Sequence, residues 1–415
     1  MHQKIQFLIL LLVCTGLFGS AKAQNYVTIP DPNFLSALQE ILPAEVFNEA
    51  GEMNADHEAV LNCWQLDVSN RGIQSLDGIQ YFNSLGSLNC NGNQLTSLPD
   101  LPQSLWSVLC SDNSLTVLPS LPAMLQSLDC EANQLVELPR LPISLKYLYC
   151  SFNELAVLPD LPLTLEILHC SFNELPALPE LPVSLKTLVC SFNELTELPE
   201  LPDLLEELIF NSNMIVALSL LPEALRSLDC GANQLIELPA LPQSLIGLYC
   251  SSNQLTELPS LPVLLWSLSC SSNQLTELPE LPQSLESLWC FSNQLTVLPE
   301  FPERLYDLNA HNNCFSTMPE RPEWIDAAKF SVSPNRADCI ITGLASESEN
   351  QSDIYPNPVE DVLYLGAMYD DARVYDLGGR ELGHYSNTDH IGTTNWSSGV
   401  YLIRLGERYV RVVKQ

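Results

Sequence analysis

Residues 145–164 read LKYLYCSFNELAVLPDLPLT, and this stretch decides the fold because close copies of it fill most of the chain. Its asparagine, Asn153, is one of twelve that follow each other at a constant spacing of 20 residues, from Asn93 to Asn313. Each unit approximates L-P-x-S-L-x-x-L-x-C-S-x-N-x-L-T-x-L-P-x. A single unit of this size cannot bury its leucines, but a stack of units can, so the repeat predicts a solenoid.

The pattern within one unit predicts a short strand followed by a tight turn. Leu148 and Cys150 are two residues apart and therefore point to the same side of a strand, while Tyr147 and Tyr149 point to the other side. The side-chain amide of Asn153 can satisfy backbone groups of neighbouring coils that water does not reach. The prolines that follow favour an extended return path. Strands of successive coils should therefore form a parallel sheet with a spacing of ~4.8 Å.

This unit resembles the leucine-rich repeat, L-x-x-L-x-L-x-x-N-x-L, with cysteine in the third apolar position, and its tandem L-P-x-L-P resembles the short repeats of secreted bacterial effectors. The match is unbroken over residues 85–319. The resemblance implies an α/β-type leucine-rich-repeat solenoid with a parallel β-sheet on its concave face and an extended, polyproline-like convex side. We expect residues 24–84 to form an N-terminal cap with a degenerate first repeat, and residues 320–343 to form a C-terminal cap.

The two ends of the chain predict export. Residues 1–23 have an apolar core and end in Ala21-Lys22-Ala23, which is typical of a secretory signal peptide. Residues 344–353 are polar and predict a linker. Residues 354–415 contain short β-like runs separated by turn signals, which predicts a small all-β sandwich of the immunoglobulin-like kind.

The C-terminal residues resemble the type A sorting domain of the Por (type IX) secretion system. The resemblance is carried by Tyr355-Pro356-Asn357-Pro358, Val374-Tyr375-Asp376 with Gly378-Gly379-Arg380, Ser398-Gly399-Val400-Tyr401 and Val412-Val413-Lys414. It implies passage through the outer membrane with the secretion machinery as a partner, followed by release or surface attachment. An adhesive sandwich domain is the alternative interpretation of this region.

The cysteines predict packing in the array and one candidate disulfide beyond it. Ten of them, from Cys90 to Cys190 and from Cys230 to Cys290, share one inward position that holds Phe210 or Ala310 in other units, which indicates small apolar filling. Parallel Cβ vectors do not favour disulfides, and a flat ladder does not converge on a metal. Cys314 and Cys339 lie outside this position and are a candidate pair, although spacing alone does not fix connectivity. We expect no metal and no cofactor.

Charge and motifs point away from several classes of function. The chain has 17 basic and 50 acidic side chains and a net charge of −33, which disfavours nucleic-acid backbones and anionic membranes as partners. The sequence contains no H-E-x-x-H, G-x-S-x-G or P-loop motif, so we do not expect an enzyme. No segment after the signal peptide is apolar enough over a sufficient length to predict a transmembrane helix.

The variable strand positions predict where a ligand binds. Aromatic and apolar residues on a rigid concave face are typical anchors of protein interfaces. The candidate residues are Tyr147, Tyr149, Ile167, His169, Thr187, Val189, Tyr249, Trp289, Phe152, Phe172 and Phe192. The three phenylalanines have a second interpretation, in which they stack on one another and shield the core.

These observations favour a secreted or cell-surface binding or adhesion protein whose concave face takes a protein or glycan. The alternative is a structural spacer without a specific ligand, and a hydrolase is a more distant one.

Overall fold

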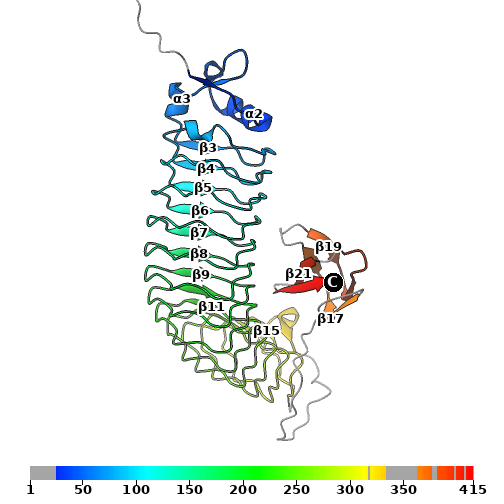
Figure 1. The fold of residues 1–415 in the computed structure, drawn as a ribbon. Helices are drawn as coiled ribbons and strands as arrows, with labels where there is room; N and C mark the ends of the chain where they lie inside the picture. The colour runs from blue at the N-terminus through cyan, green and yellow to red at the C-terminus, as the bar shows by residue number, and fades with distance from the viewer. Residues whose placement is uncertain are drawn as a thin grey trace, which may run out of the picture.

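The computed structural model describes residues 25–315, 318–332, 362–375, 381–396, 399–405 and 408–414. The described residues from 25 to 332 form one curved solenoid, and those from 362 to 414 form separate small antiparallel sheets (Figure 1). The predicted signal peptide, the predicted linker and Cys339 lie outside the described residues.

The solenoid begins with a cap that covers the open end of the first coil. It consists of β1 (Tyr26–Val27), which pairs antiparallel with β2 (Met53–Asn54), α2 (Pro32–Ile41), η1 (Ala44–Val46) and α3 (Glu58–Leu61). One carboxylate oxygen of Asp31 accepts hydrogen bonds from the N–H groups of Asn33 and Phe34 at the start of α2. Its other oxygen accepts from the N–H groups of Gln74 and Ser75, so this side chain fastens the cap helix to the first coil.

A parallel sheet of fourteen strands follows in sequence order, as the repeat predicts. Its strands, with two intervening 3-10 helices, are β3 (Gln65–Asp67), η2 (Ile79–Tyr81), β4 (Ser87–Asn89), β5 (Ser107–Leu109), β6 (Ser127–Asp129), β7 (Tyr147–Tyr149), β8 (Ile167–His169), β9 (Thr187–Val189), β10 (Glu207–Ile209), β11 (Ser227–Asp229), β12 (Gly247–Tyr249), β13 (Ser267–Ser269), β14 (Ser287–Trp289), β15 (Asp307–Asn309), η3 (Ala327–Lys329) and β16 (Phe330–Ser331). The return path between β4 and β15 contains no helix among the described residues, which confirms an extended convex side.

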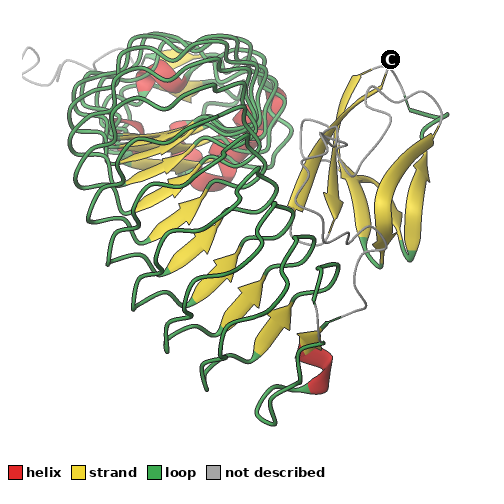
Figure 2. Cartoon of the chain, turned by 90° about the horizontal axis from the view of Figure 1, so that it is seen from below, coloured by secondary structure: helices red, strands yellow, loops and turns green. Residues whose placement is uncertain are grey.

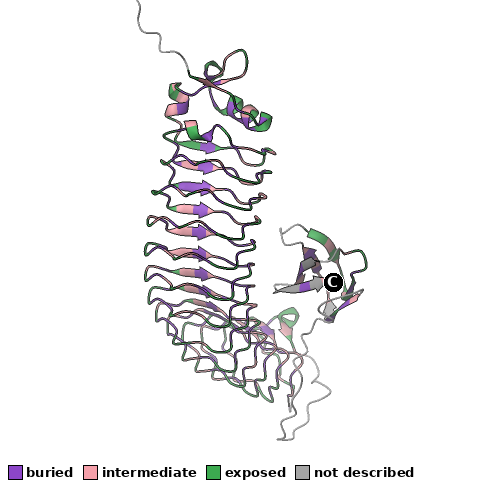
Figure 3. Cartoon of the chain, viewed as in Figure 1, coloured by how far each residue is buried: buried purple, intermediate pink, exposed green. Residues whose placement is uncertain are grey.

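Buried and outward-facing side chains alternate along each strand, as the period-two pattern requires. The central residue of each strand from β4 to β15 is buried, and its neighbours are mostly half-exposed (Figure 3). The ten ladder cysteines are fully buried free thiols. The Cys90 thiol donates a hydrogen bond to the carbonyl of Leu109 in the next coil, at 3.3 Å. The cysteine position therefore contributes packing and a weak bond between coils.

The asparagine ladder joins each coil to the one before it. The side-chain nitrogen of Asn153 donates to the carbonyls of Cys150 in its own coil and Cys130 in the preceding coil. Its side-chain oxygen accepts from the backbone N–H of Leu135. The pattern repeats along the array with a step of 20 residues and satisfies backbone groups that are closed off from water.

The C-terminal region is all β. It contains β17 (Val362–Tyr369), β18 (Ala372–Tyr375), β19 (Glu381–Tyr385), β20 (Thr388–Gly392), β21 (Gly399–Leu405) and β22 (Arg408–Lys414). β17 pairs with β20, and the other strands form an antiparallel sheet in the order β19-β18-β21-β22. Figure 2 shows these strands in yellow and the described loops between them in green. The core between them contains Leu363, Val374, Ile391 and Ile403. This agrees with the prediction of a small all-β domain.

Candidate binding surface

The register of the sheet brings six of the predicted residues together on β7, β8 and β9. Tyr147 aligns with Ile167 and then with Thr187, and Tyr149 aligns with His169 and then with Val189. All six side chains are half-exposed. They form two parallel rows of three, which we call the concave patch.

Partial burial keeps the concave patch uncharged near neutral pH. The rings of Tyr149 and His169 meet edge to face, with centroids 4.9 Å apart and planes at 84°. Burial lowers the pKa of His169, so its imidazole is neutral at pH 7. Burial, together with the nearby Asp129 carboxylate, raises the pKa of Tyr149. The patch therefore suits contacts with apolar and hydrogen-bonding groups.

Carboxylates that the repeat pattern does not single out lie on both sides of the concave patch. Asp129 on β6 aligns directly with Tyr149, and Glu131 follows it. Asp229 lies on β11, where its carboxylate accepts a hydrogen bond from the Asn211 side chain at 2.7 Å. Burial raises the pKa of all three carboxyls. The place of Asp129 and Asp229 on the strand face could have been found from their position in the repeat, but the partial burial of the three carboxyls could not.

Tyr249 and Trp289 lie apart from the concave patch, on β12 and β14. The ring of Tyr249 covers Gly247, because a Cβ added there would lie 3.1 Å from the ring. The indole nitrogen of Trp289 donates to the carboxylate of Asp307 at 3.0 Å. These two residues are on the predicted face, but the structure does not join them to the other six.

Phe152, Phe172 and Phe192 form a stacked column just beyond the strands. Successive ring centroids are 4.2 Å apart, and the ring planes are inclined by 12° and 10°. Each phenylalanine has a positive φ, between 53° and 56°, at the turn before the ladder asparagine. The rings therefore stack on one another, as one interpretation predicted, and they also stay half-exposed.

A charged ridge precedes the strands. Lys146, Glu166, Lys186, Glu206 and Arg226 occupy the same position in five consecutive coils, so positive and negative charges alternate. Lys186 and Glu166 form an ion pair at 2.8 Å. An exposed ion pair of this kind contributes little to the stability of the fold, so the alternating charges matter mainly for the character of the surface.

Three exposed aliphatic side chains lie three residues before the ridge. Ile143, Leu163 and Val183 are 81%, 75% and 72% exposed in the coils that carry the concave patch. Large apolar side chains so exposed in adjacent coils are typical of interaction surfaces.

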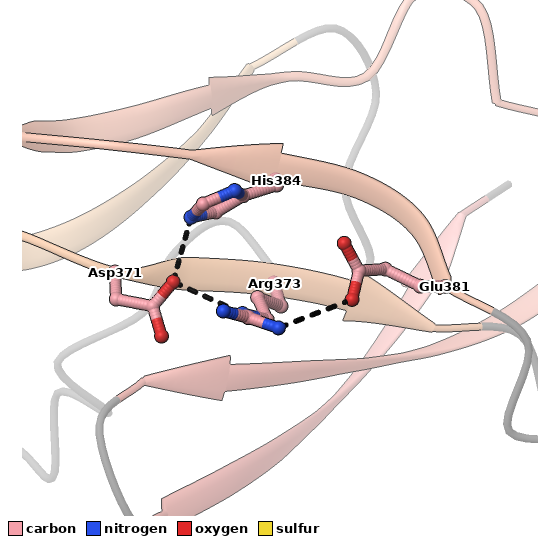
Figure 4. A network of polar contacts seen from close by, with 4 residues as sticks. All are labelled: Asp371, Arg373, Glu381 and His384. Atoms are coloured by element: carbon pink, nitrogen blue, oxygen red, sulfur yellow. Dashed lines mark hydrogen bonds and ion pairs between the residues drawn. The ribbon is translucent and has the colours of Figure 1, made fainter.

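The all-β region has a surface network of its own (Figure 4). Asp371 contacts the Arg373 guanidinium at 3.0 Å and His384 at 2.7 Å, and Arg373 also contacts Glu381 at 3.5 Å. The Arg373 guanidinium lowers the pKa of Asp371. The four side chains link β18 to β19 and are all substantially exposed, so we expect these ion pairs to add little stability.

Two further findings concern metal ions and membranes. Among the described residues, no group of three or more His, Cys, Asp or Glu side chains is placed to hold a metal ion. Within the same residues, no helix combines the length and the apolar character needed to cross a bilayer.

A solenoid of 20-residue coils with a parallel concave sheet and a buried asparagine ladder defines a leucine-rich-repeat protein. The structure resembles YopM of Yersinia pestis, described as a leucine-rich effector protein, with a TM-score of 0.56 and 31% sequence identity over 73% of this chain and 98% of that one. The chain therefore belongs to the leucine-rich-repeat family.

Two other comparisons extend this assignment. The functional domain of InlJ from Listeria monocytogenes, described as including a cysteine ladder, matches with a TM-score of 0.55 and 22% identity over 95% of this chain and all of that one, which shows a shared fold. Residues 353–415 match the family described as the secretion system C-terminal sorting domain. No curated protein matches the chain.

Proposed function

We propose that this protein is exported to the cell surface or the medium and binds a partner protein or glycan through its concave patch without catalysing a reaction. The sorting-domain family at residues 353–415 supports export by the type IX route. In this proposal residues 1–23 are removed as a signal peptide, residues 24–343 bind the partner, and residues 354–415 engage the secretion machinery. We also propose Cys339 as the partner of Cys314, which is disulfide-bonded.

One observation carries the binding proposal: aromatic and apolar side chains gather on three adjacent strands. β13 has serine at both outward positions, Ser267 and Ser269, whereas β7 has tyrosine at both. The fold therefore accepts small polar residues at these positions and does not need the aromatic ones. Large side chains that the fold does not need, clustered and half-exposed on a rigid sheet, favour a role in recognition.

The test uses affinity capture from the native surroundings with the full chain. The variant Y147S/Y149S/I167S/H169S gives β7 and β8 the Ser-Leu-Ser pattern of β13, so folding should be preserved. We expect it to lose captured partners by at least tenfold, because a few central anchors dominate most interfaces.

The control variant V157S/V297S changes two exposed valines of the return path. We expect it to capture partners as the parent does. If the four-residue variant retains every partner, the concave patch is not the binding site, and a structural spacer becomes the better description.

A further inference from the structure

The three coils that carry the concave patch share a second departure from the repeat. Each contains the sequence C-S-F-N-E-L, at residues 150–155, 170–175 and 190–195. None of the other nine coils with a ladder asparagine has an aromatic residue before it or an acidic residue after it. The residues before it there are Gly92, Asp112, Ala132, Ser212, Ala232, Ser252, Ser272, Ser292 and Asn312, and those after it are Gln94, Ser114, Gln134, Met214, Gln234, Gln254, Gln274, Gln294 and Cys314.

The phenylalanines of this sequence form a continuous apolar face. Their rings stack at 4.2 Å and remain half-exposed beside the strands. The fold does not require them, because residues 252 and 272 are serines with nearly the same φ, 57° and 53°. The column is therefore an apolar surface that the turn geometry permits but does not demand.

A row of carboxylates accompanies the column and indicates what it binds. Glu154, Glu174 and Glu194 are exposed, and the structure gives none of them an ion pair within the described residues. Adjacent coils are ~4.8 Å apart, so three like charges in this row repel one another. These carboxylates do not belong to any group placed to hold a metal in the described part of the chain. Cationic side chains of a partner would complement them.

We propose that these six residues, which we call the Phe–Glu strip, dock a Lys- or Arg-rich segment of a partner protein. The inference deepens the proposed function and rests on it. Lysine and arginine have apolar stems that can pack on the exposed edges of the rings, while their charged ends reach the carboxylates. The net charge of −33 favours the approach of such a segment from a distance.

The experiment measures binding of fluorescein-labelled decalysine to the full chain by fluorescence anisotropy at low ionic strength. The first variant, E154Q/E174Q/E194Q, takes the glutamine that six other coils have at this position. The second variant adds F152S/F172S/F192S, which makes these coils C-S-S-N-Q-L, as residues 250–255 and 270–275 already are. A charge-matched control, E237Q/E257Q/E277Q, removes three exposed carboxylates from the return path.

We expect the first variant to bind decalysine about tenfold more weakly, since three exposed ion pairs of about twofold each are lost. The second variant should bind still more weakly, and the control should change affinity less than twofold. Transplanting the strip with S252F/Q254E, S272F/Q274E and S292F/Q294E should raise the binding stoichiometry from one peptide to two.

Equal weakening by the first variant and the control would show that only total charge matters, and it would overturn the proposal. The proposal would also be overturned if the second variant bound decalysine as tightly as the parent chain does. It would be overturned as well if spermine displaced the peptide equally well from the parent chain and from the second variant. The concave-patch variant Y147S/Y149S/I167S/H169S separates the two proposals, because it keeps the strip. It should retain decalysine binding even where it loses captured partners.

Discussion

Replacing a single ladder asparagine should destabilise the solenoid far more than replacing its neighbour. Asn273 is buried, and its side-chain nitrogen donates to the carbonyls of Cys250, Cys270 and Ser271 at 3.0, 3.1 and 3.2 Å. Its oxygen accepts from the N–H of the fully buried Leu255 at 3.0 Å. Asn273→Ala removes all four hydrogen bonds at once.

The magnitude follows from which groups lose their only partner. The carbonyls of Cys250 and Cys270 keep bonds from the side chains of Asn253 and Asn293. The N–H of Leu255 keeps no other hydrogen-bond acceptor among the described residues, and a buried N–H group left without a partner costs about 1–3 kcal/mol. With about 1 kcal/mol for the lost donor bonds, the free energy of unfolding should fall by about 3 kcal/mol.

Urea unfolding followed by tryptophan fluorescence measures this change, because Trp266 and Trp289 lie in the same coil and the next one. Gln274→Ala is the control, since Gln274 is exposed and follows the ladder asparagine directly. It should change stability by less than about 0.5 kcal/mol. A loss below about 1 kcal/mol for Asn273→Ala, or equal losses for the two variants, would refute the reasoning.

Two further predictions concern titrating groups that are wholly or partly buried. Burial raises the pKa of the Cys90 thiol to about 12 and also raises the pKa of the other nine ladder thiols. Of the free cysteines in the described part of the chain, only Cys63 should therefore react with a disulfide reagent at pH 8 in the native protein, whereas all ten ladder thiols should react in denaturant. Burial also raises the pKa of Asp229 above its usual 3.8, so its contribution to stability is complete at pH values below 3.8 and is lost as the pH rises through the folded-state pKa. Asp229→Asn should therefore unfold at a higher temperature than the parent at pH 7, with a gain that shrinks toward pH 4, and no gain at pH 7 would contradict this.

Local sequence determined the architecture because every coil repeats the same requirements. Leu148 and Cys150 must share a side of a strand, and Asn153 must serve the backbone of the preceding coil, so the 20-residue period predicted the parallel sheet and its register. The C-terminal motifs likewise predicted a small all-β region and its family.

Contacts between coils were decided only by the tertiary structure. The sequence left open whether Phe152 and Phe172 bind or stack, and the left-handed turn makes them stack while one side stays exposed. The partial burial of Asp129 and Asp229 and the bond from Trp289 to Asp307 also depend on how side chains lean across neighbouring strands. A period fixes which side of the coil a residue faces, whereas its rotamer, its neighbours 20 residues away and the curvature of the stack fix what it touches.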